Sequence, residues 1–246
     1  GAAALIELAA ALQAWGQQPV SDIWLVATSC EEGLGDLRGI RAAYAALRDK
    51  VGAAINIEGM AFGHVYHAGI AVQRLKITAE ADGGHSWLHF GRPSAVHSIA
   101  QLGAQIARIQ PQQSPRTTYN IGMISGGEAI NAIATRAELW LDMRSEDSGE
   151  LAKLRREVEA CIASVEQPGL RLQVEVVGDR PSGRIATNHP LVMAGLAALE
   201  TVGMQGSLYR GSTDANIPLQ DGCPTITIGI TRGSNAHRLD EYIETG

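Results

Sequence analysis

The chain has 246 residues, of which 45% are hydrophobic and 19% charged, a composition typical of a globular protein with a buried core. Its net charge of −6 and the absence of a Lys/Arg run argue against nucleic acid as a partner, because phosphate binding requires a basic surface. No apolar run approaches the roughly 18 residues of a membrane span. Three widely spaced cysteines favour reduced thiols, as in a cytoplasmic protein, over a disulfide framework.

The first quarter of the chain predicts a parallel α/β unit. Residues 1–15 have leucines at helical spacing and predict an amphipathic helix that packs on a sheet. The apolar run 23–27 predicts a buried strand, residues 36–47 a helix, and residues 51–57 a second buried strand. This order predicts parallel strands joined by a right-handed crossover. Because the chain starts inside the first helix without a capping residue or an initiator Met, we expect an upstream segment to have been removed.

The pattern changes near Gly63, where apolar and polar residues begin to alternate as they do in a one-sided antiparallel sheet. The order strand–helix–strand–strand–helix–strand predicts a compact α+β sandwich inserted into the first domain. Towards the C-terminus the α/β pattern returns. We therefore predict one domain from residues 1–62 and 182–246, and an inserted domain from residues 63–181. The elements predicted for the insert are strands within 65–82, 119–124, 137–143 and 170–177, and helices over 94–109 and 149–165.

Potential metal ligands follow three predicted strands. Glu31 and Glu32 come after the first strand, Glu58 ends the second, and His237 lies in the Gly/Ser-rich loop after the last strand. Ligand sites in open α/β sheets lie at the carboxyl ends of strands, so these side chains are expected to converge. Adjacent carboxylates can divide two tasks, one holding a cation and the other moving protons. Each residue alone is more often an ordinary surface residue, but together they predict a cation site.

Five segments in this order resemble one known family: TSCEEGLGDLRGIR, NIEG, GGHSW, GGEAINAIATRAELWLDMRSED and GSTDANIPLQDGCPTITIGITRGSNAH. The family is the dinuclear zinc hydrolases that include acetylornithine deacetylase, succinyl-diaminopimelate desuccinylase, aminoacylase and peptidase T. The resemblance implies an α/β zinc-hydrolase domain with an inserted, ferredoxin-like lid that forms a homodimer. It also implies a cytoplasmic metallopeptidase or deacylase that cleaves an amide bond in a small peptide or an N-acyl amino acid.

The resemblance assigns roles to four residues of the predicted cation site. Glu31 corresponds to the general base, Glu32 and His237 to ligands of one zinc, and Glu58 to a ligand of the second zinc. The family's other ligands, a histidine in a His-x-Asp motif and a bridging aspartate, lie in the expected upstream segment and are absent from this sequence. Two zinc ions are therefore expected in a complete subunit, and weak or no zinc binding and no hydrolysis in these 246 residues.

The inserted domain supplies further residues by the same resemblance. His85 corresponds to the lid histidine that approaches the scissile carbonyl, often from the partner subunit, and Asn131 to a lid asparagine near the substrate. Arg144 corresponds to the arginine that binds a substrate carboxylate, although a structural salt bridge is an equally good interpretation of it. Ser212, Thr213 and Asp214 correspond to residues that line the pocket or orient the ligands.

Two other functions account for part of the pattern. Glu31 and Glu58 could form the acid–base pair of a glycosidase, but this leaves His237 and the Gly-Gly-His motif without a role. The chain could also be a non-catalytic, dimeric relative that binds amino acids or peptides. The lack of upstream ligands favours that interpretation, whereas the intact Glu31–Glu32 pair argues against it.

Overall fold

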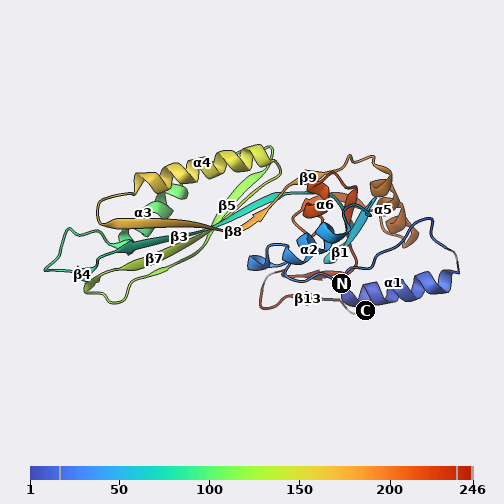
Figure 1. Cartoon of the computed structure of the whole chain (residues 1–246), viewed down its shortest axis with the longest axis horizontal. Coiled ribbons are helices and arrows are strands. Elements are labelled where there is room, and N and C mark those ends of the chain that lie inside the picture. The colour runs from blue at the N-terminus through green and yellow to red at the C-terminus, as the bar shows by residue number, and fades with distance from the viewer. Residues whose placement is uncertain (17, 237, 245–246) are drawn as a thin grey trace. The chain divides into compact units, whose positions relative to one another are not determined.

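The computed structural model describes residues 1–16, 18–236 and 238–244 (Figure 1). The chain divides into two compact units. Unit 1 contains Gly1–Gly69 and Gly183–Gly246, and unit 2 is the intervening Ile70–Ser182. None of the helices in the described part of the chain combines the length and the hydropathy that crossing a membrane requires.

Unit 1 is built on a mixed five-stranded sheet with helices around it. The strand order is β1-β11-β2-β10, and β9 also pairs with β2. The β1/β11 and β2/β10 pairs are parallel, whereas β11 and β9 both run antiparallel to β2. The elements of unit 1 are α1 (Ala2–Trp15), η1 (Gly33–Gly35), α2 (Arg38–Leu47), β1 (Ala54–Phe62), β2 (His64–Gly69), β9 (Gly183–Arg184), α5 (Pro190–Thr201), β10 (Ser207–Gly211), α6 (Asn216–Gln220), β11 (Thr225–Gly229), β12 (Gly233–Ser234) and β13 (Tyr242–Ile243).

The sheet of unit 1 differs from the predicted parallel sheet because β2 belongs to it. The alternating residues of β2 led us to place this strand in the insert, but all its hydrogen-bonded neighbours are strands of unit 1. The boundary expected at Gly63 therefore lies after Gly69. A single alternating strand fits a mixed sheet as well as an antiparallel one, so the sequence pattern alone does not distinguish them.

Two predictions for the first 30 residues are wrong. Residues 23–27 form no strand, and the side chains of Ile23, Trp24, Leu25 and Val26 are each more than a third exposed. A strand requires a hydrogen-bonding neighbour, and none of the described strands pairs with this segment. The helix predicted over residues 1–15 exists as α1, but none of its residues is buried. Alanines place apolar surface on all its sides, so no distinct face is directed towards a sheet.

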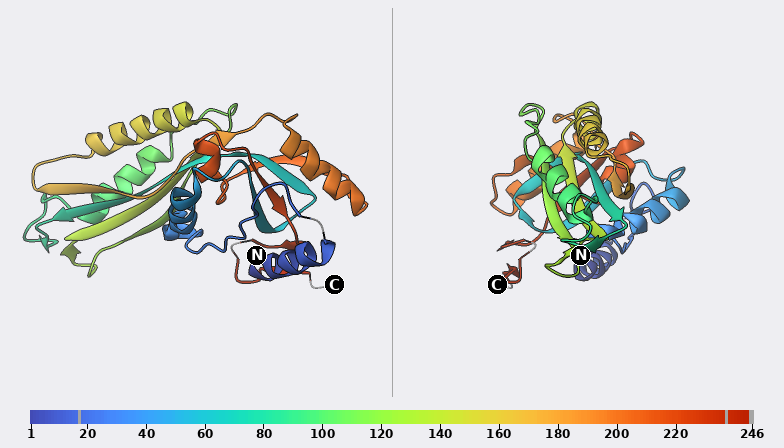
Figure 2. Two further views of the ribbon diagram at one scale, coloured as in Figure 1. Left: turned by 45° about the vertical axis from the view of Figure 1, so that its right-hand side comes forward. Right: turned by 90° about the vertical axis from the view of Figure 1, so that its left-hand side faces the viewer.

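Unit 2 has the predicted α+β architecture. Its antiparallel sheet has the order β5-β7-β3-β8, and α3 and α4 both pack on one face of it (Figures 1 and 2). This order and the sequence of elements are those of a ferredoxin-like sandwich. The elements are β3 (Ala71–Ala81), β4 (Gly84–His85), α3 (Ala95–Ile106), β5 (Thr117–Gly126), β6 (Ala132–Ile133), β7 (Arg136–Ser145), α4 (Ser148–Ser164) and β8 (Leu170–Arg180).

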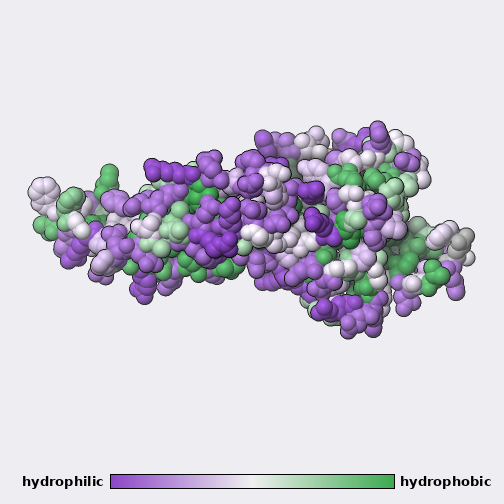
Figure 3. Space-filling view, turned by 90° about the horizontal axis from the view of Figure 1, so that it is seen from above, coloured by the Kyte–Doolittle hydropathy of each residue, from purple (hydrophilic) through white to green (hydrophobic). Residues whose placement is uncertain are grey.

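The hydrophobic cores of the two units differ in size. Alternate residues of β7, including Leu139, Leu141 and Met143, are buried with residues of β3, α3 and α4 in one large cluster. Among the described residues of unit 1, the buried cluster contains four: Val65, Val192, Leu199 and Ile226. Many apolar side chains remain on the surface, and Figure 3 shows hydrophobic residues interspersed among hydrophilic ones. Unit 2 therefore has the larger hydrophobic contribution to its stability.

Candidate functional site

The loop that carries Glu31 and Glu32 is held by backbone hydrogen bonds. Glu32 precedes the 3₁₀ turn η1, and its carbonyl accepts from the Gly35 amide at 2.8 Å. The Gly39 amide donates to the Ser29 carbonyl at 3.1 Å, and a Cβ at Gly39 would lie 2.1 Å from that oxygen. The close approach thus requires glycine at this position. Glu31 is half-buried in the resulting loop, whereas Glu32 is exposed.

Glu58 lies on β1 and is oriented by a neighbouring amide. The Asn56 side-chain Nδ2 donates to Glu58 Oε1 at 3.2 Å and contacts Thr227 Oγ1 on β11 at 3.3 Å. Burial raises the pKa of the Glu58 carboxyl, the hydrogen bond from Asn56 opposes this, and the negative charges of Asp214 and Glu32 raise the pKa further. Glu58 and Glu32, predicted to converge, are thus within electrostatic reach of each other. A cation bound there would reverse the effect, because opposite charge favours the ionised carboxylate.

Asp214 is a buried carboxylate of the same region that the predicted catalytic and metal-binding set did not include. It accepts a hydrogen bond from the Thr28 hydroxyl, from a segment 186 residues away in sequence. Its loop is fixed by the buried Asn216, whose Oδ1 accepts from the Thr213 amide at 3.0 Å. Thr213 Oγ1 also contacts Thr227 Oγ1 at 3.0 Å, which connects this loop to the residues around Glu58. The GSTDAN motif was the only sequence signal for this arrangement.

The described residues do not form a complete metal site. In residues 1–16, 18–236 and 238–244, no three His, Cys, Asp or Glu side chains are grouped so that they could hold a metal ion. His237, the predicted third ligand, lies outside the described residues. Carboxylate oxygens do suit zinc, but a firmly held zinc ion usually needs at least three protein ligands. The described residues therefore supply no set of donors that would hold a zinc ion firmly.

The structure brings His85 and Asn131 together in unit 2. His85 ends β4, which pairs with β6 so that His85 lies opposite Ala132. The Asn131 carbonyl accepts a hydrogen bond from the Ser86 amide at 3.0 Å, so the two predicted lid residues flank one small ribbon. Both side chains are exposed.

Arg144 forms the salt bridge that was the alternative to a substrate-binding role. Its Nε donates to Asp142 Oδ1 at 2.7 Å, and Arg74 Nε donates to Asp142 Oδ2 at 2.8 Å. Burial would raise the pKa of the Asp142 carboxyl, but hydrogen bonds from Arg144 and Arg74 outweigh burial and lower it. The Arg144 side chain is still 44% exposed. Arg144 thus pairs with a carboxylate on its own strand. To bind a substrate carboxylate, it would have to contact both carboxylates or release Asp142.

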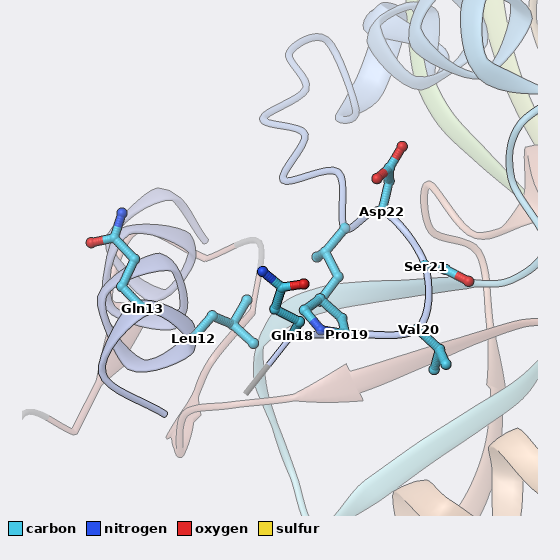
Figure 4. Close-up of a pocket in the computed structure, with 8 residues that line it drawn as sticks. Leu12, Gln13, Gln18, Pro19, Val20, Ser21 and Asp22 are labelled. Atoms are coloured by element: carbon cyan, nitrogen blue, oxygen red, sulfur yellow. The ribbon is translucent and has the colours of Figure 1, made fainter. Parts of the chain in front are cut away.

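A hollow of about 500 Å³ in unit 1 contains none of the predicted site residues (Figure 4). Asp22 is the only ionisable residue among the described residues that line it, and these residues supply neither a set of metal ligands nor an acid–base pair. The lining residues come from α1 and the segment that follows it: Leu12, Gln13, Gln18, Pro19, Val20, Ser21, Asp22 and Ile23.

Residues 67–169, which include the elements of the unit 2 sandwich from β3 to α4 but not β8, match the family model of the M20 peptidase dimerisation domain. Over this segment the chain is similar to the M20 peptidase family. Acetylornithine deacetylase of Shigella sonnei (strain Ss046) is 32% identical over 133 residues, which are 53% of this chain and 34% of that protein. The Klebsiella pneumoniae (strain 342) enzyme is 31% identical over 133 residues, with the same coverage. The matched part thus spans about a third of the length of these relatives.

Solved structures of similar fold cover more of this chain. Aminopeptidase PepT from Bacillus cereus has a TM-score of 0.67 at 19% identity, covering 85% of this chain and 57% of that one. A tripeptidase from Staphylococcus aureus has a TM-score of 0.65 at 20% identity, covering 84% and 55%. At this identity the likeness establishes the fold, which confirms the predicted α/β architecture with an inserted dimerisation domain.

Proposed function

We propose that this chain belongs to the M20 peptidase family and carries part of the catalytic centre of a metal-dependent hydrolase that cleaves an amide bond. The observation that carries the proposal is the position of Glu58, which lies in the middle of β1, where the register with β11 shifts, within electrostatic reach of Glu32 and Asp214. Deacetylases and peptidases among the similar proteins support an amide substrate. Since a structural role does not require several acidic groups near one another, this arrangement favours a site for a cation and a reacting carbonyl.

The proposed roles follow from the chemistry of each side chain. Glu31 would accept a proton from the attacking water and return it to the leaving amine, as a general base and then a general acid. Glu32, Glu58 and His237 would serve as zinc ligands, although the described donors do not complete a site. His85 would donate a hydrogen bond to the oxygen that becomes negative in the transition state. Arg144 and Asn131 would bind the carboxylate and amide groups of a small peptide or an N-acyl amino acid.

The 246-residue chain is expected to hold less than one zinc ion per molecule after dialysis and to hydrolyse none of a panel of dipeptides, tripeptides and N-acyl amino acids. Fewer than three described ligands are grouped together, and the sequence contains no His-x-Asp motif. Elemental analysis measures the metal. Tight, stoichiometric zinc would contradict the prediction and would assign ligand roles to other residues.

The activity itself is tested on the full-length product of the gene that encodes this chain, supplied with zinc and assayed on the same panel. Hydrolysis that is lost in Glu31→Gln but retained in Glu157→Gln, a change on helix α4 of unit 2, would support the proposal. Full activity of Glu31→Gln would overturn the assignment of the general base. An inactive protein that still binds these ligands would instead favour the second candidate, a non-catalytic binding relative.

We further propose that the chain forms a homodimer through unit 2. Its outer strands β5 and β8 leave apolar side chains exposed, including Met123, Ile124, Val174 and Val176. Exposed edges of this kind pair readily with another strand. The match to a dimerisation domain supports the same association. Light scattering is expected to give twice the chain mass at micromolar concentration, and a monomer there would contradict it.

A further inference from the structure

Two histidines close a tight turn at β4. The backbone amide of His85 donates to the ring Nδ1 of His89 at 2.9 Å, and the His89 amide donates to the His85 carbonyl, also at 2.9 Å. Within this turn, the Trp87 amide donates to Nδ1 of the His85 ring at 3.2 Å. Both polar backbone groups of His85, and one nitrogen of its ring, are therefore engaged by the residues that immediately follow it.

These hydrogen bonds determine which ring nitrogens carry protons. A neutral imidazole has one N–H donor and one acceptor nitrogen, and a nitrogen that accepts a hydrogen bond cannot hold the proton. Because Nδ1 of His85 accepts from Trp87, the proton of the neutral ring lies on Nε2. The ring of His85 therefore has a donor at Nε2, the atom at the outer end of the side chain.

The local sequence is adapted to this arrangement. A Cβ on Gly84 would lie 2.5 Å from Nδ1 of His89, and Gly84 has a φ of +141°, so only glycine lets the His89 ring approach the backbone here. Arg92 Nη1 donates to the Gly83 carbonyl at 3.3 Å and ties the end of the turn to its beginning. The Ser86 amide, bound to the Asn131 carbonyl, joins the turn to β6.

We propose that His89 is a positioning residue that fixes the turn and thereby holds His85 in the tautomer with its proton on Nε2. The tautomer is a property of unit 2 alone. Its catalytic consequence is that Nε2–H of His85 is available to donate to the substrate oxygen, and this consequence rests on the proposed amide-hydrolase function. No motif pointed to His89, because its role depends on a ring nitrogen that faces the backbone four residues earlier.

The test compares two replacements of His89 in the 246-residue chain. His89→Asn keeps an acceptor, since the side-chain Oδ1 of asparagine can take the place of Nδ1, whereas His89→Phe keeps a ring without an acceptor. Long-range ¹H–¹⁵N spectra at about pH 9, where imidazoles are neutral, distinguish protonated from unprotonated ring nitrogens. We expect a single Nε2-protonated form of His85 in the parent chain and in His89→Asn, and a mixture of tautomers in His89→Phe.

His97→Phe is the matched control, because it removes an exposed imidazole from α3 in the same unit and should leave the His85 spectrum unchanged. Circular dichroism verifies that each variant is folded. A proton on Nδ1 of His85 in the parent chain would overturn the proposal, and so would an unchanged tautomer in folded His89→Phe. These spectra do not depend on catalysis, so failure of the hydrolysis assay would leave the positioning result standing.

Discussion

Replacing Gly229 with alanine is expected to destabilise unit 1 by about 3 kcal/mol, a cost at the upper end of the range for an overpacked core. Gly229 pairs with both Glu58 and Phe62 of β1, at the point where the register of β1 and β11 shifts. A Cβ there would lie 1.9 Å from the carbonyl carbon of Ala61. Because this neighbour is backbone, no side-chain rotation relieves the clash, and β1 must move away from β11.

Hydrogen exchange with mass spectrometry measures this effect separately in each unit, because amides exchange through local opening. Peptides from β1 and β11 should lose protection in Gly229→Ala, while those from β3 and β7 should keep it. Gly52→Ala is the control, since nothing lies within 4 Å of a Cβ at that position. Equal protection of β1 in the parent chain and in Gly229→Ala would refute the close approach of the two backbones.

Replacing Leu139 with alanine is expected to destabilise unit 2 by about 2–5 kcal/mol. Its side chain is fully buried on β7, within the cluster formed by the sheet and its two helices. Truncation removes apolar contacts and leaves a cavity, and the paired strands around Leu139 cannot collapse fully to fill it. Loss of protection should extend to β3 and β5, which pair with β7 on its two sides.

Leu88→Ala makes the same chemical change at an exposed position of unit 2 and provides the control. Leu88 is 72% exposed, so its truncation should change stability by no more than about 0.5 kcal/mol. Comparable effects of the two substitutions would mean that the helices and sheet of unit 2 do not pack as described. Unfolding in urea, monitored by far-UV circular dichroism, gives an independent measurement of both variants.

The sequence predicted unit 2 better than unit 1 for a physical reason. In unit 2, β7 alternates buried and more exposed residues and α3 buries one apolar stripe, so local pattern and tertiary packing agree there. In unit 1 the segment 23–27 is as apolar as a buried strand, yet no described strand pairs with it. Hydrophobicity indicates that a segment prefers burial, but it does not specify a hydrogen-bonding neighbour.

For the site, the sequence predicted types of residue more readily than their contacts. Glu58 was a candidate because it ends a strand-like run, and its electrostatic interaction with Glu32 agrees with the expected convergence. The roles of Asn56 and Thr227 were not predicted, since their contact joins residues that are 171 positions apart. A contact between residues so far apart in sequence leaves no recognisable pattern in either local segment. It becomes apparent only when the register of β1 on β11 is known.

The long separation in sequence between β1 and β11 determines the order in which the two units can fold during synthesis. All elements of unit 2 are contiguous between Ile70 and Ser182, whereas β1 must wait for β11, which leaves the ribosome after the entire insert. Unit 2 can therefore complete its sheet while the first 69 residues still lack their partner strands. During translation, the nascent chain thus exposes the edges of β1 and β2 throughout the time needed to produce an entire domain, an interval in which chaperones can act on them.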